Sequence, residues 1–185
     1  MIKIIDNFLT KEECLELIDM GTIQMQKATT LGAKIDGYRT ADNSWLYEST
    51  PTTEKIINFI AKESGLPAEN QENIHIVKYD IGGEYKPHHD YFHPNEQYYK
   101  DSMGTAGNRP FSFLIYLNHN YTGGETEFPN KKIKVTPREG RMLIWRNMNE
   151  DGTLEPESFH AGLPVKTQTK YIAIVWVREN KFKIK

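Results

Sequence analysis

Residues 79–92 read YDIGGEYKPHHDYF, and the rest of the chain is best interpreted outward from this stretch. Within it, His88 precedes Asp90 by two residues. Residues two apart on a β-strand point to the same face, so this spacing predicts one imidazole and one carboxylate side by side. Two histidines and one carboxylate form the facial triad that holds non-haem Fe(II). We therefore expect a second histidine from a distant part of the chain, and His160, in SFHAGLPV, is the candidate.

The same residues have a simpler explanation, which the spacing leaves open. A chain with six histidines contains an HxD pair by chance often enough that the motif needs further support. Taken alone, His160 would be read as a partly buried histidine that caps a loop. His89 is expected on the opposite face of the strand from His88. His75 and His119 have no ligand spacing, and His93 is expected to be a loop residue that faces the metal side poorly.

The composition is that of an ordinary globular protein. The chain has 185 residues, of which 38% are apolar and 26% charged, and this length fits one domain over residues 1–185 with its own core. The net charge of −2 argues against general nucleic-acid binding. The single cysteine, Cys14, excludes an internal disulfide and is predicted to be a buried apolar residue. No run approaches the roughly 18 apolar residues of a membrane span. We expect a cytoplasmic protein that does not enter the membrane, of undetermined oligomeric state.

The first third of the chain predicts two helices after a short opening strand in residues 2–8. Thr10 begins a capping box, followed by an apolar stripe with helical spacing. Thr50 and Pro51 fit the N-cap and first position of a second helix, which Gly65 ends. The apolar stripe of each predicted helix is interpreted as packing against the core.

From residue 73 onward the sequence changes to short apolar runs. These runs predict strands in residues 73–80, 85–92, 111–118, 132–137, 140–147 and 171–179. Residues 29–44 are predicted to form a loop with a short strand, residues 121–129 a turn, and residues 94–108 a long polar loop beside the site. Two helices followed by roughly eight strands, without βαβ alternation, predict a mostly β fold: a double-stranded β-helix (jelly roll) flanked by the N-terminal helices.

The last strand contains a lysine whose facing decides its role. In KYIAIVWVR, alternation places Lys170, Trp176 and Arg178 on one face with two isoleucines. If this face is the interior, the ammonium needs an anionic partner, because burying an unpaired charge is costly. If it is the outer face, Lys170 is solvated and Arg141 is the next candidate to hold an anion. The opposite face is also apolar, so alternation alone leaves both readings open.

Together these motifs resemble the catalytic domain of the prolyl 4-hydroxylase family, within the 2-oxoglutarate and Fe(II)-dependent dioxygenases. The matching stretches are YRTADNSWL, Tyr79 with YKPHHDYF, NRPFSFLIYLN, GGETEFP, and HAGLPV with Lys170 and Trp176. Each stretch alone is weak, but their order and spacing over most of the chain are specific. The chain departs from the family at Arg178, where some members have a histidine.

The resemblance implies roles for three groups of residues. The implied iron ligands are His88, Asp90 and His160. The implied 2-oxoglutarate contacts are Tyr79, Thr126 and Lys170, with Lys170 pairing with the distal carboxylate. The positions that match the peptide-substrate side are Tyr85, Arg109 and Trp176.

The implied reaction is 4-hydroxylation of a peptidyl proline, coupled to conversion of 2-oxoglutarate to succinate and carbon dioxide. Fe(II), 2-oxoglutarate and O2 are the implied cofactors and cosubstrates, with ascorbate as an optional addition, and a proline-containing peptide or protein is the implied partner. Two alternatives stay open. The same triad could hydroxylate another protein side chain, a free amino acid or a nucleobase, because the fold and the triad do not define the substrate. A non-catalytic jelly-roll binding module is disfavoured by the presence of all three candidate ligands and Lys170.

Overall fold

The computed structural model describes residues 2–28, 38–94 and 99–182. The elements of the first half are β1 (Ile2–Ile5), α1 (Lys11–Thr22), β2 (Gln26–Lys27), β3 (Asp42–Trp45), α2 (Pro51–Ser64), β4 (His75–Tyr79), β5 (Tyr85–His88) and α3 (Tyr99–Met103). The second half contains β6 (Phe111–Tyr116), β7 (Thr122–Gly123), β8 (Thr126–Phe128), β9 (Ile133–Val135), β10 (Met142–Arg146), β11 (His160–Gly162), β12 (Val165–Thr167) and β13 (Lys170–Val177). Short 3-10 turns span Ala68–Asn70, Pro129–Lys131 and Pro156–Ser158.

Both long helices begin where the sequence predicts. The hydroxyl of Thr10 accepts from the backbone N–H of Glu13, and the Glu13 carboxylate accepts from the backbone N–H of Thr10, which completes a capping box. Thr50 caps α2, with Pro51 in its first turn. Gly65 ends α2 in the left-handed conformation, with φ of 70°.

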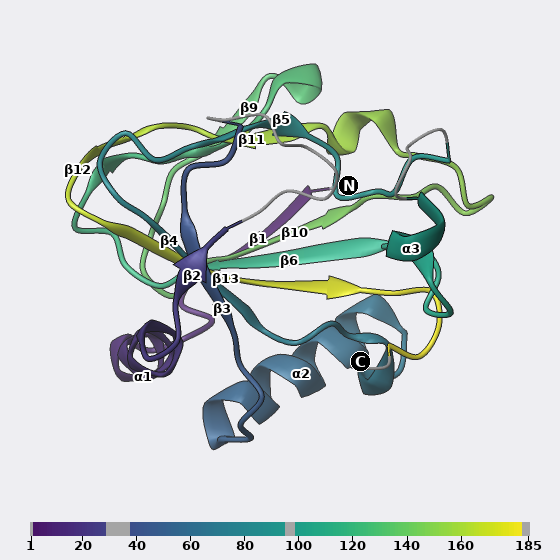
Figure 1. Ribbon diagram of the computed structural model, residues 1–185, viewed down its shortest axis with the longest axis horizontal. Helices are drawn as coiled ribbons and strands as arrows, with labels where there is room; N and C mark the ends of the chain where they lie inside the picture. The colour runs from purple at the N-terminus through teal and green to yellow at the C-terminus, as the bar shows by residue number, and fades with distance from the viewer. Residues whose placement is uncertain (1, 29–37, 95–98, 183–185) are drawn as a thin grey trace.

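The strands form two main antiparallel sheets. The larger has the order β1-β10-β6-β13-β4-β3-β2, and the smaller has the order β5-β11-β8-β9, while β12 and β7 form a separate pair. In Figure 1 the smaller sheet lies above the larger one, and α1 and α2 lie below it. This arrangement matches the predicted jelly roll with helices on one side.

The larger sheet separates two apolar cores, and β13 contributes to both. Ala173, Val175 and Val177 pack toward α1 and α2. Ile172, Ile174 and Trp176 face the space between the two sheets. The even-numbered residues of the last strand therefore point inward, which resolves the alternative that the sequence left open.

Several short elements differ from the predictions. Residues 121–129 were expected to be a turn but contain β7 and β8, because these residues pair with the distant strands β12 and β11. The polar segment 94–108 contains α3, and its residues 95–98 lie outside the described ranges. In the segment 29–44 the strand β3 is confirmed, and residues 29–37 lie outside the description. The opening strand ends at Ile5, before a turn with a positive φ at Asn7. None of the helices in the described part of the chain is long and apolar enough to cross a bilayer.

The close packing of α1 on β4 leads to a stability prediction at Gly21. A Cβ at this position would lie 2.6 Å from Cγ2 and 2.8 Å from Cβ of Ile76, so no rotation of the isoleucine relieves the contact. An alanine within a helix normally gains about 0.5–1 kcal/mol over glycine. Overpacking of a core costs about 1–3 kcal/mol and should prevail. We expect Gly21→Ala to lower the free energy of unfolding in urea titrations.

The control for this prediction is Asp19→Ala, at an exposed position of the same helix. It should change the free energy of unfolding by less than about 0.5 kcal/mol. Equal stabilities of Gly21→Ala and the unmodified protein would contradict the packing argument.

Candidate metal centre and substrate cleft

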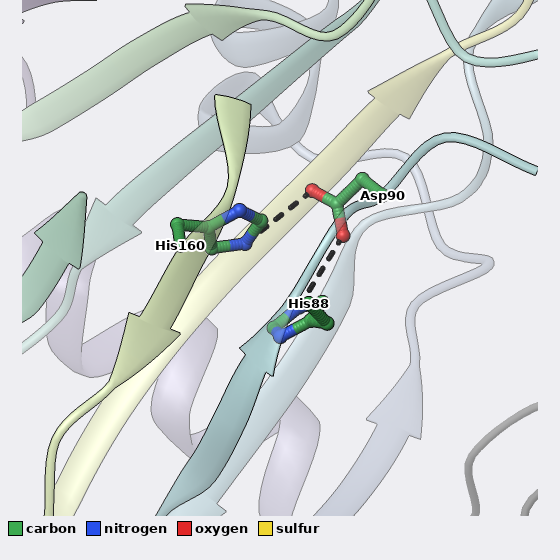
Figure 2. A group of neighbouring side chains, drawn as sticks. All are labelled: His88, Asp90 and His160. Atoms are coloured by element: carbon green, nitrogen blue, oxygen red, sulfur yellow. Dashed lines mark ion pairs between the residues drawn. The ribbon is translucent and has the colours of Figure 1, made fainter. Parts of the chain in front are cut away.

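Pairing of β5 with β11 brings the two predicted histidines together. His88 and His160 are direct partners in this antiparallel pair. Asp90 lies beside both of them: its Oδ1 is 3.6 Å from Nε2 of His88, and its Oδ2 is 3.8 Å from Nε2 of His160. Figure 2 shows the carboxylate between the two imidazoles. Ligand atoms of the three residues lie within 4.8 Å of one another, and in the described ranges no other cluster of this kind occurs.

The local geometry of this group corrects one detail of the sequence argument. We expected His88 and Asp90 on one strand, but β5 ends at His88 and Asp90 lies in the bend that follows. The chain bends after β5, and the buried Asp90 side chain contacts Ser112 of β6. His89 is half-buried near His93 and Phe159 and does not join the cluster.

Each imidazole is held so that Nε2 is its free nitrogen. Nδ1 of His88 lies 2.8 Å from the carbonyl oxygen of Lys86, and Nδ1 of His160 lies 2.8 Å from that of Ser158. A carbonyl oxygen can only accept, so both Nδ1 atoms carry the proton. Such hydrogen bonds orient metal-binding histidines. Aromatic rings also pack against the imidazoles, with centroid distances of 3.5 Å for Tyr85 on His88 and 4.7 Å for Trp145 on His160.

The Asp90 carboxylate is oriented by a buried hydroxyl from β6. Ser112 donates to Oδ2 of Asp90 at 2.6 Å, and the amide of Asn147 donates to the Ser112 hydroxyl at 2.8 Å. Burial alone would raise the pKa of Asp90, but the adjacent His160 and His88 hold it well below its usual range. Asp90 is therefore ionised at neutral pH.

His160 is neutral under the same conditions. Burial and the neighbouring His88 lower the pKa of His160 to about 4. A neutral imidazole with a free Nε2 is the form that binds a metal ion. Two such nitrogens and one carboxylate oxygen are the donor set that non-haem Fe(II) takes, so the three residues fit this metal.

Lys170 lies inside the fold, as its predicted facing requires. It is 2% exposed, and its ammonium donates to the carbonyl oxygen of Gly124 at 2.7 Å. The ammonium also lies 5.1 Å from the ring centroid of Tyr79, its partner across β13 and β4, and 5.7 Å from that of Tyr116. It has no carboxylate partner within ion-pair distance in the described residues. Burial therefore lowers the pKa of Lys170 to about 7.

Thr126 lines the same end of the interior. Its hydroxyl accepts from the phenol of Tyr116 at 2.7 Å, and Tyr116 in turn lies beside Lys170. The phenol oxygen of Tyr121 is buried there without a hydrogen-bond partner. Lys170, Tyr79, Tyr116 and Thr126 thus form one polar group within an otherwise apolar interior. A small dianion would satisfy the ammonium and the free phenol.

The residues predicted for the peptide side present two aromatic faces, one of them on a metal ligand. Tyr85 stacks on His88. The Arg109 guanidinium lies 4.0 Å from the ring centroid of Trp176. Arg109 also makes two hydrogen bonds with the buried carboxylate of Glu72, at 2.7 and 2.8 Å. The ion pair with Glu72 fixes Arg109 against the face of Trp176, and we call Tyr85 and Trp176 together the aromatic wall.

Comparison with known proteins identifies the family. The model of the 2OG-Fe(II) oxygenase superfamily matches residues 74–178, which is more than half of the chain. The chain belongs to this superfamily. Prolyl 4-hydroxylase 1 of Arabidopsis thaliana is 32% identical over 200 residues, covering 96% of this chain and 69% of the relative. Prolyl 4-hydroxylase 5 of the same plant is 30% identical over 205 residues, covering 96% and 68%.

Solved structures agree with this assignment. The viral collagen prolyl hydroxylase of Paramecium Bursaria Chlorella virus-1, in its 2OG complex, has a TM-score of 0.77 and 25% identity over 96% of this chain and 95% of that chain. A prolyl-4-hydroxylase from Pseudomonas putida shares the fold, with a TM-score of 0.65 at 17% identity. The protein is therefore a 2-oxoglutarate- and Fe(II)-dependent dioxygenase of the prolyl 4-hydroxylase-like type, and its metal ligands are the predicted triad.

Sequence reasoning missed several residues of this oxygenase site. Ser112 and Tyr116 could have been found, because they are polar residues on the inward face of an otherwise apolar strand. Arg39 had no such signal: residues 38–40 pair with β5, and its guanidinium lies 4.8 Å from the Tyr85 ring centroid. Its Nε atom is buried without a hydrogen-bond partner.

Arg141 and His75, two further candidates from the sequence, contact other parts of the protein and do not join the site. Arg141 pairs with Asp6 at 2.6 Å and donates to the carbonyl of Thr136, so it is not available to the interior pocket. His75 is buried, and its ring stacks on Trp45 with centroids 4.1 Å apart. Burial lowers the pKa of His75 well below its usual value, so this imidazole is neutral.

The hydrogen bond from Ser112 to Asp90 predicts a specific effect on iron binding. Ser112→Ala removes the donor that orients one carboxylate oxygen, and loss of such a partner typically weakens metal affinity about 10–100-fold. We expect this increase in the Fe(II) concentration needed for half-maximal succinate release, with the fold intact.

Ser44→Ala is the matched control, since Ser44 is also buried and donates to a backbone carbonyl far from the triad. It should lower stability without changing the Fe(II) requirement. An unchanged Fe(II) requirement in Ser112→Ala would show that the hydroxyl does not orient the ligand.

Proposed function

We propose that this dioxygenase hydroxylates C4 of prolyl residues in a peptide or protein substrate. The observation that carries the proposal is the aromatic wall beside the triad, in which Tyr85 stacks on a metal ligand and Trp176 lies under Arg109. A prolyl ring packs well on aromatic faces, and guanidinium groups can donate to peptide carbonyls. The relatives that cover nearly the whole chain are named prolyl 4-hydroxylases.

The residues divide the work between two ends of the interior. Bound Fe(II), with 2-oxoglutarate and O2, supplies the oxidant for an unactivated C–H bond. His88, Asp90 and His160 would hold the metal. Lys170 would pair with the distal carboxylate of 2-oxoglutarate, and Tyr79 and Thr126 would line the same pocket. Tyr85, Arg109 and Trp176 would orient the peptide on the opposite side and exclude water from the reacting carbon.

Other features of the sequence interpretation remain predictions. They are the single domain over residues 1–185, the cytoplasmic location, the optional use of ascorbate and the absence of nucleic-acid partners. Aromatic faces can also stack a nucleobase, so the substrate class is tested directly.

A panel of proline-containing peptides tests the proposed function. Incubation with Fe(II), 2-oxoglutarate and O2 should add one oxygen, a gain of about 16 Da, and acid hydrolysis should release 4-hydroxyproline. The same peptides with alanine in place of proline are the matched control. Oxygen incorporation into a free amino acid, a nucleobase or a non-prolyl side chain, with no prolyl product across the panel, would replace the proposed substrate.

Substitution of Lys170 tests the proposed cosubstrate anchor. Removing one member of a buried ion pair typically costs about 3–5 kcal/mol, which is two or more decades in binding. We expect Lys170→Ala to raise the KM for 2-oxoglutarate at least about a hundredfold, while the Fe(II) requirement changes little. Lys170→Arg should also be impaired, because a planar fork replaces a point charge. A KM for 2-oxoglutarate that is unchanged in Lys170→Ala would remove Lys170 from the site.

The lowered pKa of Lys170 predicts a pH dependence of cosubstrate binding. Its pKa is about 7 instead of the ordinary 10.5, so the free protein loses this positive charge as the pH rises above about 7. A dicarboxylate binds the protonated form, so the dissociation constant for 2-oxoglutarate should rise by up to about tenfold per pH unit above pH 7. Calorimetric titrations across this range measure the effect.

The same shift predicts the sign of the stability change. Between pH 7 and 10.5 the unfolded chain carries the proton on Lys170 and the folded chain does not, so this residue's contribution to stability rises with pH. Lys170→Arg is the comparison, because arginine stays charged and should bind 2-oxoglutarate weakly at every pH in this range. A free energy of unfolding and a 2-oxoglutarate affinity that vary with pH in the same way in the two proteins would contradict the titration of Lys170.

A further inference from the structure

Arg178, just past the end of β13, is a buried cation that the metal and cosubstrate sites do not use. It is 4% exposed. Its Nε donates to the carbonyl oxygen of Gly107 at 2.9 Å, and its Nη2 donates to those of Ser102 and Met103, each at 2.8 Å. Nη2 also donates to Gly107. One guanidinium therefore gathers the carbonyl groups at the end of α3 and in the turn that follows.

These carbonyl groups need such a partner. The last carbonyl groups of a helix have no backbone N–H partner within the helix, and a cation is favourable at that end. The turn is also tightly packed: Gly107 has a φ of 76°, and a Cβ there would lie 2.5 Å from the Glu179 carboxylate. Glu179 accepts from the backbone N–H of Asn108 at 2.6 Å. Residues 102–108 are thus tied to the end of β13 by the side chains of Arg178 and Glu179, and by backbone hydrogen bonds from Glu179 to Asn108 and from Asn180 to Ala106.

The other side of the guanidinium contacts Glu72, which it shares with Arg109. Nη1 of Arg178 lies 3.0 Å from Oε1 of Glu72, and the same oxygen accepts from Nε of Arg109 at 2.7 Å. Glu72 is 5% exposed, so both ion pairs are buried. Phe92 packs against both arginines, with its ring centroid 4.7 Å from the Arg109 guanidinium and 4.9 Å from that of Arg178. The two arginines are therefore linked through one carboxylate and one aromatic ring.

A direct contact between Arg178 and a peptide is disfavoured by this arrangement. Nε, Nη1 and Nη2 of Arg178 all donate to protein groups. Arg109, in contrast, is held by Glu72 on one side and presents its plane to Trp176 on the other. An effect of Arg178 on the substrate would therefore be indirect, through Glu72 and Arg109 or through residues 102–107.

We propose that Arg178 is a positioning residue for peptide binding: it anchors residues 102–107 and, through the shared carboxylate of Glu72, orients Arg109 against Trp176. The inference rests on the proposed role of Arg109 on the peptide side. It places a specificity function on a residue that touches neither the metal ligands nor the cosubstrate pocket.

The test uses Arg178→Gln, which removes the charge and the fork. The KM for a hydroxylated prolyl peptide should rise at least about tenfold, the loss expected for one charge-assisted hydrogen bond. The KM for 2-oxoglutarate and the slow turnover of 2-oxoglutarate without peptide should stay within about twofold of the unmodified protein. Hydrogen exchange at the amides of Gly104 and Gly107, which bond to carbonyls of α3, should accelerate at least about tenfold.

Two further variants separate the two contacts of Arg178. Arg178→Lys keeps a positive charge for Glu72, but a point charge cannot reach all three carbonyls. It should restore most of the peptide KM while exchange at Gly104 and Gly107 stays fast, and it serves as the test if Arg178→Gln does not fold. Glu179→Ala loosens the same segment without touching Glu72, so it should accelerate exchange and leave the peptide KM unchanged.

Two results would overturn the proposal. One is an unchanged peptide KM in Arg178→Gln, and the other is an equal rise in Glu179→Ala, which would assign the effect to the segment alone. If the unmodified protein hydroxylates no prolyl peptide, the proposed function fails on its own. Exchange and a double-mutant cycle between Arg178→Gln and Arg109→Gln on the free energy of unfolding then decide the positioning role, and additive effects with normal exchange would refute it.

Discussion

The antiparallel pairing of β5 with β11 is the constraint on which the metal centre depends. It sets two histidines from positions 72 residues apart in the sequence (160 − 88) directly opposite each other. Asp90 follows β5 closely enough to reach both imidazoles, and Ser112 holds it there from the neighbouring sheet. A shift of this register by one residue would turn one histidine to the other face of the sheet and leave an incomplete donor set.

Buried charge organises the rest of the interior, and its two ends differ. Within the described ranges the Lys170 ammonium contacts a carbonyl oxygen and two tyrosine rings and has no ion pair, so it favours an anionic ligand. Arg109 and Arg178 share the single carboxylate of Glu72, and Arg178 also donates to carbonyl oxygens, so both guanidinium groups have protein partners. The first arrangement suits binding of a small dianion. The second suits orientation of side chains, because loss of the shared carboxylate would leave two buried cations without an anionic partner.

Local sequence signals predicted the elements that depend on nearby residues. The capping box at Thr10, the N-cap at Thr50 and the glycine end of α2 at Gly65 are confirmed because each involves contacts within a few residues. Strands β7 and β8 were missed because they are short and depend on pairing with other strands: β7 with β12, and β8 with β11 and β9. The glycine-rich sequence between them resembles a turn until those partners are present.

The sequence by itself determined the donor set, the presence of a lysine on the last strand and the order of motifs that indicates the oxygenase family. These follow from residue identity and spacing, which do not require the fold. Only the tertiary structure decided that the even-numbered face of β13 is the interior, since both faces are apolar and the choice depends on which one the helices cover. It likewise decided that Arg178 turns to the carbonyls after α3 and to Glu72, because those partners lie more than 70 residues away along the chain.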